Sequence, residues 1–239
     1  MMFKFLKRSH DQSNLPSPNR LVANFLEKLK NTGMTPKHII DIGAHRGDWS
    51  RTALSVFPEA NISLFEPQAR LSSDLLDLQQ HPRVKIHYKG VGDFDGFAPF
   101  TIHDRDDSCS FVYLEDAARD RGFTQTEIEV CQLDTALVDS IYGAPDIIKI
   151  DAEGYDLEVL SGAKVSLQSA EIVFIEASVS NQDYPNSVLT VAQKMHQLGY
   201  RLLDFTDLNR TPNRKFLWLV EAVFVRIGSQ IDLATTVFD

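Results

Sequence analysis

Two acidic residues at the ends of short apolar segments are the groups most able to position a ligand in this chain. Asp41 opens the stretch DIGAHRGDWS, and Glu66 follows 25 residues later in LFEPQ. A turn containing Gly43 and Gly47 separates Asp41 from the next helical segment. Glycines let the backbone approach a ligand, and an acid at the next strand tip can accept hydrogen bonds from both ribose hydroxyls. The spacing therefore predicts a nucleotide-type site.

The glycine turn lacks the pattern of the two commonest nucleotide loops. A dinucleotide site uses Gly-x-Gly-x-x-Gly, and His45 stands here in place of the middle glycine. A P-loop needs Gly-Lys-Ser/Thr, which is absent from the sequence. An acid beside the loop suits the ammonium and sulfonium of S-adenosylmethionine, so we expect Asp41 to face the ammonium, directly or through water. A side chain at Gly43 would then block the methionine end. The alternative is an ordinary strand–turn–helix joint with a capping acid.

Composition predicts one globular domain without a nucleic-acid partner. The 239 residues are 43% hydrophobic and carry a net charge of −9, with no basic stripe between aromatics. No segment approaches the ~20 apolar residues that span a bilayer, so we expect no stable membrane insertion. Cys109 and Cys131 have no metal-ligand spacing and the histidines form no zinc pattern. We therefore name no metal ligand and expect a reducing, cytoplasmic location.

Apolar periodicity predicts helices that alternate with strands. Helices are expected at 21–30, 49–57, 69–79, 155–160 and 187–198, and strands at 38–42, 62–66, 84–88, 146–151, 172–176, 201–205 and 217–225. Residues 90–130 break this regularity and indicate an inserted hairpin with a polar loop. Alternation favours a doubly wound parallel sheet, and the short last connection favours an antiparallel last strand. Such a seven-stranded sheet is the Rossmann-like architecture of class I methyltransferases. The domain is expected at 20–228, between tails at 1–19 and 229–239.

One long motif resembles the signature of a known family. The segment IKIDAEGYDLEVLSGA (Ile148 to Ala163), preceded by LDTAL (Leu133 to Leu137), is similar to that of FkbM-type S-adenosylmethionine-dependent methyltransferases. The DIGAHRG turn and the FEP after the second strand are also in that family's style, and the resemblance covers residues 37–226. It implies methyl transfer to a hydroxyl oxygen, often on a sugar, polyketide or other secondary metabolite, and leaves the acceptor open. It also implies that Asp93 borders the adenine; the alternative is a plain turn.

The same motif contains the acids that could do chemistry. Asp151 ends an apolar strand whose carboxyl end should open into the cofactor crevice, and Glu153 lies in the next turn. Lys149 and Asp151 share a face of an extended segment, so Lys149 could hold Asp151 ionised or pair with Glu176. Asp151 is the predicted base or acceptor-orienting group; a structural ion pair is the alternative. His103, in the polar insertion, is a further candidate base, against the alternative of a solvated loop.

The candidate sites can be stated together. The cofactor-binding candidates are Asp41, Gly43, Ala44, His45, Gly47, Glu66, Pro67, Asp93 and Asp151, and the catalytic candidates are Asp151, Glu153, Lys149 and His103. The expected reaction is O-methylation of a small-molecule or glycan hydroxyl by S-adenosylmethionine. One alternative is an NAD(P)-dependent oxidoreductase, which the missing glycine and the absence of a Tyr-x-x-x-Lys pair disfavour. The other is a non-catalytic module that only binds the cofactor or a partner.

Overall fold

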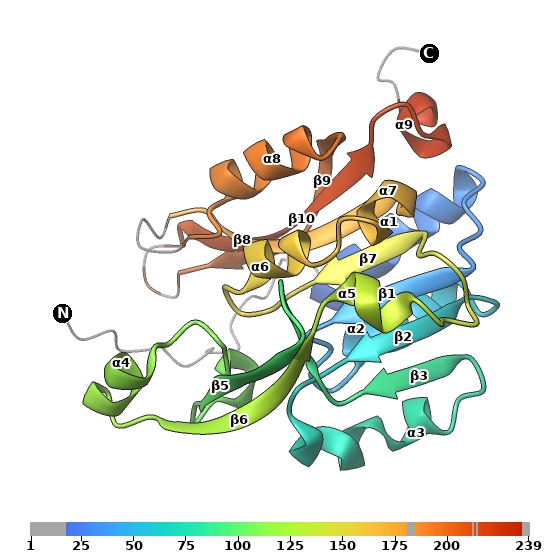
Figure 1. Cartoon of the computed structure of the whole chain (residues 1–239). Coiled ribbons are helices and arrows are strands. Elements are labelled where there is room, and N and C mark those ends of the chain that lie inside the picture. Colours follow the sequence, from blue (N-terminus) through green and yellow to red (C-terminus); the bar gives the residue numbers. More distant parts are fainter. Residues whose placement is uncertain (1–17, 181–184, 212, 214, 236–239) are drawn as a thin grey trace.

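The computed structural model describes residues 18–180, 185–211, 213 and 215–235, so most of the expected N-terminal tail lies outside it. Its centre is a seven-stranded sheet of order β3-β2-β1-β7-β8-β10-β9 (Figure 1). The strands are β1 (His38–Ile42), β2 (Asn61–Phe65), β3 (Val84–His87), β7 (Ile147–Ile150), β8 (Ile172–Ser178), β9 (Tyr200–Arg210) and β10 (Leu217–Arg226). The first five pair in parallel, whereas β10 runs antiparallel to both β8 and β9. The predicted doubly wound sheet with an antiparallel last strand is confirmed.

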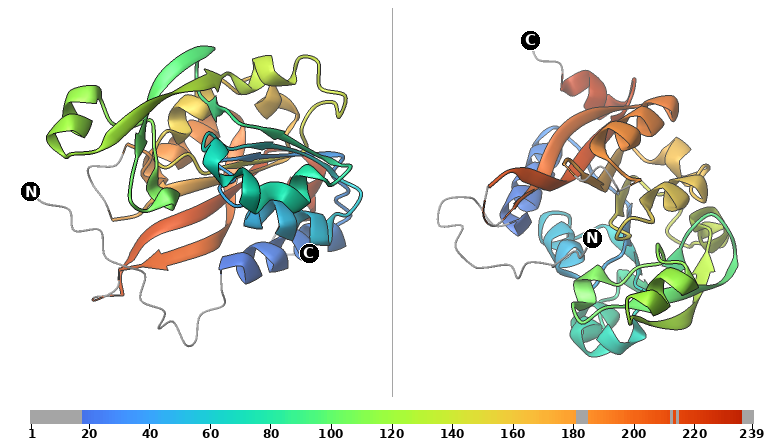
Figure 2. Two further views of the ribbon diagram at one scale, coloured as in Figure 1. Left: turned by 90° about the horizontal axis from the view of Figure 1, so that it is seen from below. Right: turned by 90° about the vertical axis from the view of Figure 1, so that its left-hand side faces the viewer.

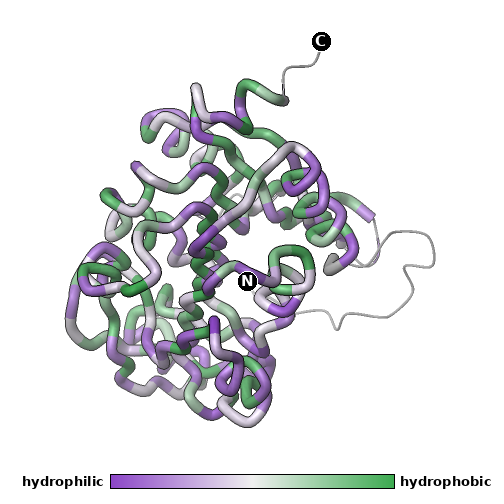
Figure 3. Tube along the Cα trace, turned by 90° about the vertical axis from the view of Figure 1, so that its right-hand side faces the viewer, coloured by the Kyte–Doolittle hydropathy of each residue, from purple (hydrophilic) through white to green (hydrophobic). Residues whose placement is uncertain are grey.

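Helices cover both faces of this sheet (Figure 2). One face packs against α1 (Pro18–Asn31) and α2 (Asp48–Val56), and the other against α6 (Asp156–Ser161), α7 (Ser166–Ser169) and α8 (Val188–Gln197). Because successive strand side chains point to opposite faces, Ile39 packs on the α1 side and its neighbour Ile40 on the α6 side. Figure 3 shows these hydrophobic stretches running through the middle of the molecule. The parallel strands therefore sit between two cores, as their nearly continuous apolar sequences require.

Two segments differ from the expected elements. Residues 69–79, predicted as one helix, form a 3-10 helix η1 (Ala69–Leu75) and then α3 (Leu76–Gln79). Ser72, Ser73 and Asp74 lie in η1, and such side chains compete for backbone hydrogen bonds. The expected C-terminal tail begins with a short helix, α9 (Gln230–Ala234), because Ile231 is buried against the sheet. Within the described residues, no helix has the length and apolarity needed to cross a membrane.

The inserted region forms a small sheet of its own. Its strands β4 (Gly90–Val91), β5 (Gly96–Ile102) and β6 (Thr124–Cys131) have the order β4-β6-β5, and β5 pairs antiparallel with β6, which follows it by 21 residues and was not predicted as a strand. Between these two strands lie η2 (Asp106–Ser108) and α4 (Glu115–Asp120), and α5 (Leu133–Leu137) follows β6. The insertion lies on the side to which the parallel strands of the main sheet point (Figure 1). It is therefore placed beside their carboxyl ends, where ligands of open α/β sheets bind.

Candidate functional site

A row of charged side chains crosses the sheet near the carboxyl ends of its strands. Asp41 of β1 is the register partner of Lys149 of β7, and Glu176 of β8 is the partner of Glu221 of β10. Strand alternation places all four on the face covered by α1 and α2, and Asp151 follows Lys149 by two residues on that face. Each strand is otherwise apolar, so the charges meet in a largely buried rim.

Lys149 is the cation at the centre of this row. Its Nζ lies 3.3 Å from Asp41 Oδ1 and 3.4 Å from Asp151 Oδ2, and it donates to the Gly43 carbonyl at 2.8 Å. Burial alone would lower the pKa of Lys149, but the carboxylates of Asp151 and Asp41 raise it above its usual range. Asp41 also accepts from Ser50 Oγ at 2.6 Å and has no exposed surface. Asp41 is thus held by Ser50 and Lys149, and its contact with a ligand ammonium, directly or through water, stays a prediction.

The glycine turn is held by the end of the neighbouring strand. The amides of Gly43 and Ala44 donate to the Phe65 carbonyl at 3.0 and 3.1 Å. Glu66 Oε2 accepts from the His45 amide at 2.7 Å, and Glu66 Oε1 accepts from the Gln68 amide at 2.8 Å. Glu66 is 2% exposed, and burial raises its pKa although the two amides oppose that shift. The half-buried Pro67 lies between Glu66 and Gln68. Glu66 thus holds the glycine turn in place, and we expect the turn and Glu66 to contact the same ligand.

The turn needs glycine at position 43 for a reason that differs from the expected one. A Cβ on Gly43 would lie 1.8 Å from the carbonyl oxygen of Asp151. The residue has a φ of +69°, and Gly47, with a φ of +79°, packs in the same way on Leu78 of α3. The first clash is therefore with protein backbone and not with a bound methionine moiety. The small residue lets the β1 turn lie directly on the end of β7, which brings the two halves of the site together.

A pocket of about 180 Å³ opens beside this turn. It is lined by Val22, residues 43–46, Asp48 and Trp49, by Lys149 and Asp151, and by Asp207 and Glu221 of the β9–β10 hairpin. Glu221 accepts from Thr206 Oγ1 at 2.5 Å, and burial raises the pKa of Glu221 to about 7. Neither hairpin acid was predicted. A lone acid within the apolar strand LWLVEAVFVR was the available signal for Glu221.

Three carboxylates gather where β7 and β8 end. One oxygen each of Asp151, Glu153 and Glu176 lies within 4.8 Å of the other two. Burial, followed by the charge of Asp151, raises the pKa values of Glu153 and Glu176 well above their usual range. Such a group can share a proton near neutral pH or hold a divalent cation through oxygen ligands. The sequence indicates Glu176 only as a partner for Lys149, and indicates no metal ligand.

The turn that carries Glu153 is shaped by a neighbouring acid. The fully buried Asp156 accepts from the amides of Ala152 at 3.0 Å and Gly154 at 3.1 Å, and from Asn186 Nδ2 at 2.7 Å. Burial raises the pKa of Asp156 to about 6. Glu153 itself has a φ of +50°, a conformation that L-residues rarely adopt. Asp156, and not Glu153, therefore organises the start of α6.

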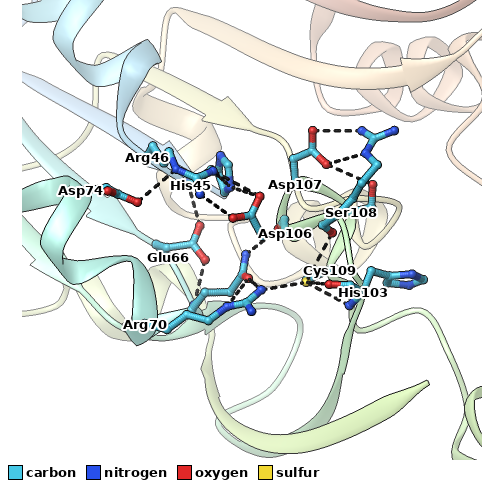
Figure 4. A network of polar contacts seen from close by, with 12 residues as sticks. His45, Arg46, Glu66, Arg70, Asp74, His103, Asp106, Asp107, Ser108 and Cys109 are labelled. Carbon is cyan, nitrogen blue, oxygen red and sulfur yellow. Dashed lines mark hydrogen bonds and ion pairs between the residues drawn. The ribbon is translucent and has the colours of Figure 1, made fainter. Parts of the chain in front are cut away.

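Two other predicted residues lie in or near the insertion. The His103 ring is 4.2 Å from the Phe123 ring and 5.5 Å from that of Tyr113, and burial lowers its pKa. In Figure 4 it lies beyond Cys109, away from the glycine turn. Asp93 is exposed after β4, and its charge, after burial, helps to raise the pKa of Tyr155. The structure thus groups His103 with aromatic side chains and leaves Asp93 open at the edge of the crevice.

A residue that the sequence does not single out connects the insertion to the glycine turn. The carboxylate of Asp106 in η2 binds Arg46 through two bonds, at 2.5 and 3.2 Å, and lies 3.2 Å from His45 Nε2 (Figure 4). Its main-chain carbonyl accepts from Gln68 Nε2 at 2.9 Å. The Arg46 guanidinium holds the pKa of Asp106 at about 2. Because these partners are some 40–60 residues distant in sequence, local pattern carries no signal for them.

Comparison with known proteins agrees with this geometry. The family model for the methyltransferase FkbM domain matches residues 41–202, which is more than half of the chain. The search of curated proteins found no match to this chain. A precorrin-6y C5,15-methyltransferase from Geobacter metallireducens is similar with a TM-score of 0.50 and 14% identity, over 89% of this chain and 90% of that one. A candidate RNA methyltransferase from Pyrococcus horikoshii has a TM-score of 0.50 and 10% identity, over 87% and 82%. An N1-methyltransferase from Burkholderia thailandensis, solved with S-adenosylhomocysteine, has a TM-score of 0.45 and 11% identity, over 88% and 79%.

Identities this low show the fold alone, which is that of class I methyltransferases. The family match is more specific, because residues 41–202 include the glycine turn, Glu66 and the acids after β7 and β8. It also identifies the cofactor as S-adenosylmethionine and removes the nicotinamide alternative. The chain belongs to the FkbM methyltransferase family and is an S-adenosylmethionine-dependent methyltransferase.

Proposed function

We propose that this enzyme methylates a hydroxyl oxygen of a sugar, a glycan or another small metabolite. The observation that carries the proposal is the group of carboxylates of Asp151, Glu153 and Glu176 beside the glycine turn. An alcohol is a poor nucleophile until a base takes its proton, which contributes about 10²–10⁴-fold to such reactions. The raised pKa values of Glu153 and Glu176 support a base that takes up a proton more readily than an ordinary carboxylate.

The residues around the turn fit the proposed cofactor. Each oxygen of Glu66 accepts one amide and keeps a further lone pair, so the carboxylate can still receive the ribose hydroxyls. The pocket beside Gly43 is lined by Asp151, Asp207 and Glu221, which suit the ammonium of the methionine end. In this arrangement the Asp93 carboxylate accepts a hydrogen bond from the exocyclic amine of the adenine.

The roles of the acids follow from their partners. Bound S-adenosylmethionine supplies an electrophilic methyl group. Lys149 neutralises Asp151, so we assign Asp151 to orienting the acceptor. Among the residues that the structure describes, no cation lies at ion-pair distance from Glu153 or Glu176, and we assign the proton of the acceptor hydroxyl to this pair. Alignment of the acceptor oxygen with the methyl carbon supplies the remaining part of the acceleration.

The charge of the site supports a neutral or cationic acceptor. Several acids surround the ends of β7, β8 and β10, and the net charge of the chain is −9. A phosphate-rich acceptor would be repelled there, so we propose no role for nucleic acid. We also propose a cytoplasmic location, which the two free, buried cysteines Cys109 and Cys131 support.

The experiment uses S-adenosylmethionine with a labelled methyl group. The enzyme is incubated with a panel of hydroxylated sugars, oligosaccharides and small metabolites, next to amines and an RNA hairpin, and products are examined by NMR. We expect label in an O-methyl group, and a fall of ~10²-fold or more in Glu153→Gln and Glu176→Gln. The control is Glu115→Gln, a change of an exposed acid in α4.

Other outcomes would replace the proposal. Label found only on nitrogen, or only in RNA, would assign the enzyme to a different acceptor class. Tight cofactor binding without transfer to any member of the panel would favour the non-catalytic module.

A further inference from the structure

The carboxylate proposed to bind ribose is covered by the insertion. Glu66 is 2% exposed, and its neighbour Gln68 is 8% exposed. The segment that lies against them is residues 103–110, between β5 and α4, which we term the covering loop (Figure 4). Glu66 is thus almost closed to solvent in this arrangement, and the covering loop is bound to its neighbours Gln68 and Arg70.

The covering loop is joined to Glu66 by a closed ring of polar contacts. The His45 amide donates to Glu66 at 2.7 Å, and the Gln68 amide donates to the other oxygen at 2.8 Å. The side chains of the same two residues contact Asp106. His45 Nε2 lies 3.2 Å from the Asp106 carboxylate, and Gln68 Nε2 donates to the Asp106 main-chain carbonyl at 2.9 Å. Movement of Asp106 therefore acts directly on the two residues that orient Glu66.

The strongest contact of the ring is ionic. The Asp106 carboxylate takes two bonds from Arg46, and that guanidinium holds the pKa of Asp106 at about 2. The pair thus stays ionised at all physiological pH values. Both side chains are partly open to solvent, so dissolved salt can screen their attraction.

The other end of the loop reaches the catalytic acids. Ser110 Oγ donates at 2.9 Å to the carbonyl of Glu153, and Cys109 Sγ lies 3.6 Å from the guanidinium of Arg70. The loop consequently bridges the glycine turn on one side and the turn after β7 on the other. A segment anchored in this way can close over a ligand that lies between them.

We propose that the covering loop is a lid, that Asp106 latches it to Arg46 and His45, and that cofactor binds and leaves through the opened form. Asp106 is then a positioning residue that controls cofactor exchange. The inference rests on the proposed placement of the ribose at Glu66. It gives the insertion, which the fold does not need for its sheet, a role in the reaction cycle.

The test measures exchange of S-adenosylhomocysteine by stopped-flow or surface plasmon resonance. Asp106→Asn keeps the shape of the side chain and removes its charge, so we expect association and dissociation each to become roughly two- to fivefold faster, the range expected for loss of one partly exposed ion pair. Asp104→Asn removes a charge from the same loop at an exposed position, and its rates should equal those of the wild type. Equal rates in Asp106→Asn and wild type would overturn the proposal.

Two further measurements separate a latch from a general structural role. Association with wild type should accelerate as salt rises from about 0.05 to 0.5 M, whereas Asp106→Asn should show little salt dependence. Arg46→Gln should accelerate exchange to a similar extent, and adding Asp106→Asn to it should change little more. Additive effects, or no salt dependence in wild type, would count against the latch. Altered exchange in an enzyme that transfers no methyl group would instead retain the latch and reject the proposed function.

Discussion

At the scale of single residues, the acids of the site differ because their partners differ. Asp41 is bound by Ser50 and Lys149, and Asp106 is held ionised by Arg46. Within the described part of the chain, Glu153 and Glu176 have no cation at ion-pair distance, and burial raises their pKa values. These different environments are the basis of the structural, latching and proton-exchanging roles that we propose for chemically similar carboxylates.

Glu66 is the residue at which cofactor recognition can be tested most directly. Glu66→Gln keeps the volume and one acceptor oxygen but removes the charge and places an NH₂ group against a donating amide. We expect the dissociation constant for S-adenosylhomocysteine to rise ~10–100-fold, because the ribose hydroxyls lose an acceptor at Glu66 once they are buried. Isothermal titration calorimetry measures this change, and thermal melting reports the accompanying loss of stability.

Glu27→Gln is the matched control, since Glu27 is exposed on α1. It should leave both affinity and melting temperature unchanged. A Glu66→Gln protein that melts normally and binds with wild-type affinity would show that this carboxylate lies outside the cofactor site.

At the scale of elements, the site depends on how closely the β1 turn lies on β7. The Asp151 amide donates to the Ile42 carbonyl at 3.1 Å, and Gly43 leaves no room for a Cβ against the Asp151 carbonyl. An analogous approach occurs at Gly162, where a Cβ would lie 1.8 Å from the Gly92 carbonyl. Two glycines thus let loops that carry site residues meet backbone to backbone.

Substitution at Gly43 should therefore affect folding first. Gly43→Ala must move the end of β7 and also adopt a φ of +69°, so we expect a loss of ~3 kcal/mol or more in the free energy of unfolding. Gly122→Ala is the control, because Gly122 has a φ of +72° with no atom within 4 Å of its added Cβ. It should lose only about 1 kcal/mol. Urea denaturation compares the two, and equal losses would show that the contact with Asp151 is unimportant.

Local pattern predicts the elements well where an apolar run is buried on both faces of the sheet. The periodicity of β1, β7 and β8 and the shared face of Lys149 and Asp151 are confirmed, because both follow from strand alternation. The partners of Asp41 and Asp106 are not predictable in this way. They depend on the order of strands in space and on the path of the insertion, which residue spacing along the chain does not encode.

At the scale of the whole molecule, buried titratable groups couple stability to pH in two directions. Burial raises the pKa of Glu221 to about 7 and that of Asp156 to about 6, so the folded state binds more protons than the unfolded state near neutrality. Their contribution to stability is complete below the unfolded pKa and is lost as pH rises through the folded pKa. Burial lowers the pKa of His87 to about 4, and that group costs stability as pH falls below about 6.5.

Between about pH 4.5 and 6 the two acids outweigh the one histidine, so these groups predict a stability that declines from about pH 4.5 toward pH 8, and Glu221 causes part of that decline. In Glu221→Gln the amide oxygen can still accept from Thr206, while the charge that forms above pH 7 is absent. The variant should therefore already be the more stable protein at pH 6, and its advantage should widen by on the order of 1–2 kcal/mol by pH 8. For a chain of this size that corresponds to about 2–8 °C. Parallel melting curves for the two proteins from pH 6 to 8 would mean that Glu221 is already ionised in the folded state, and that the acidic rim of the sheet is more solvated than its burial implies.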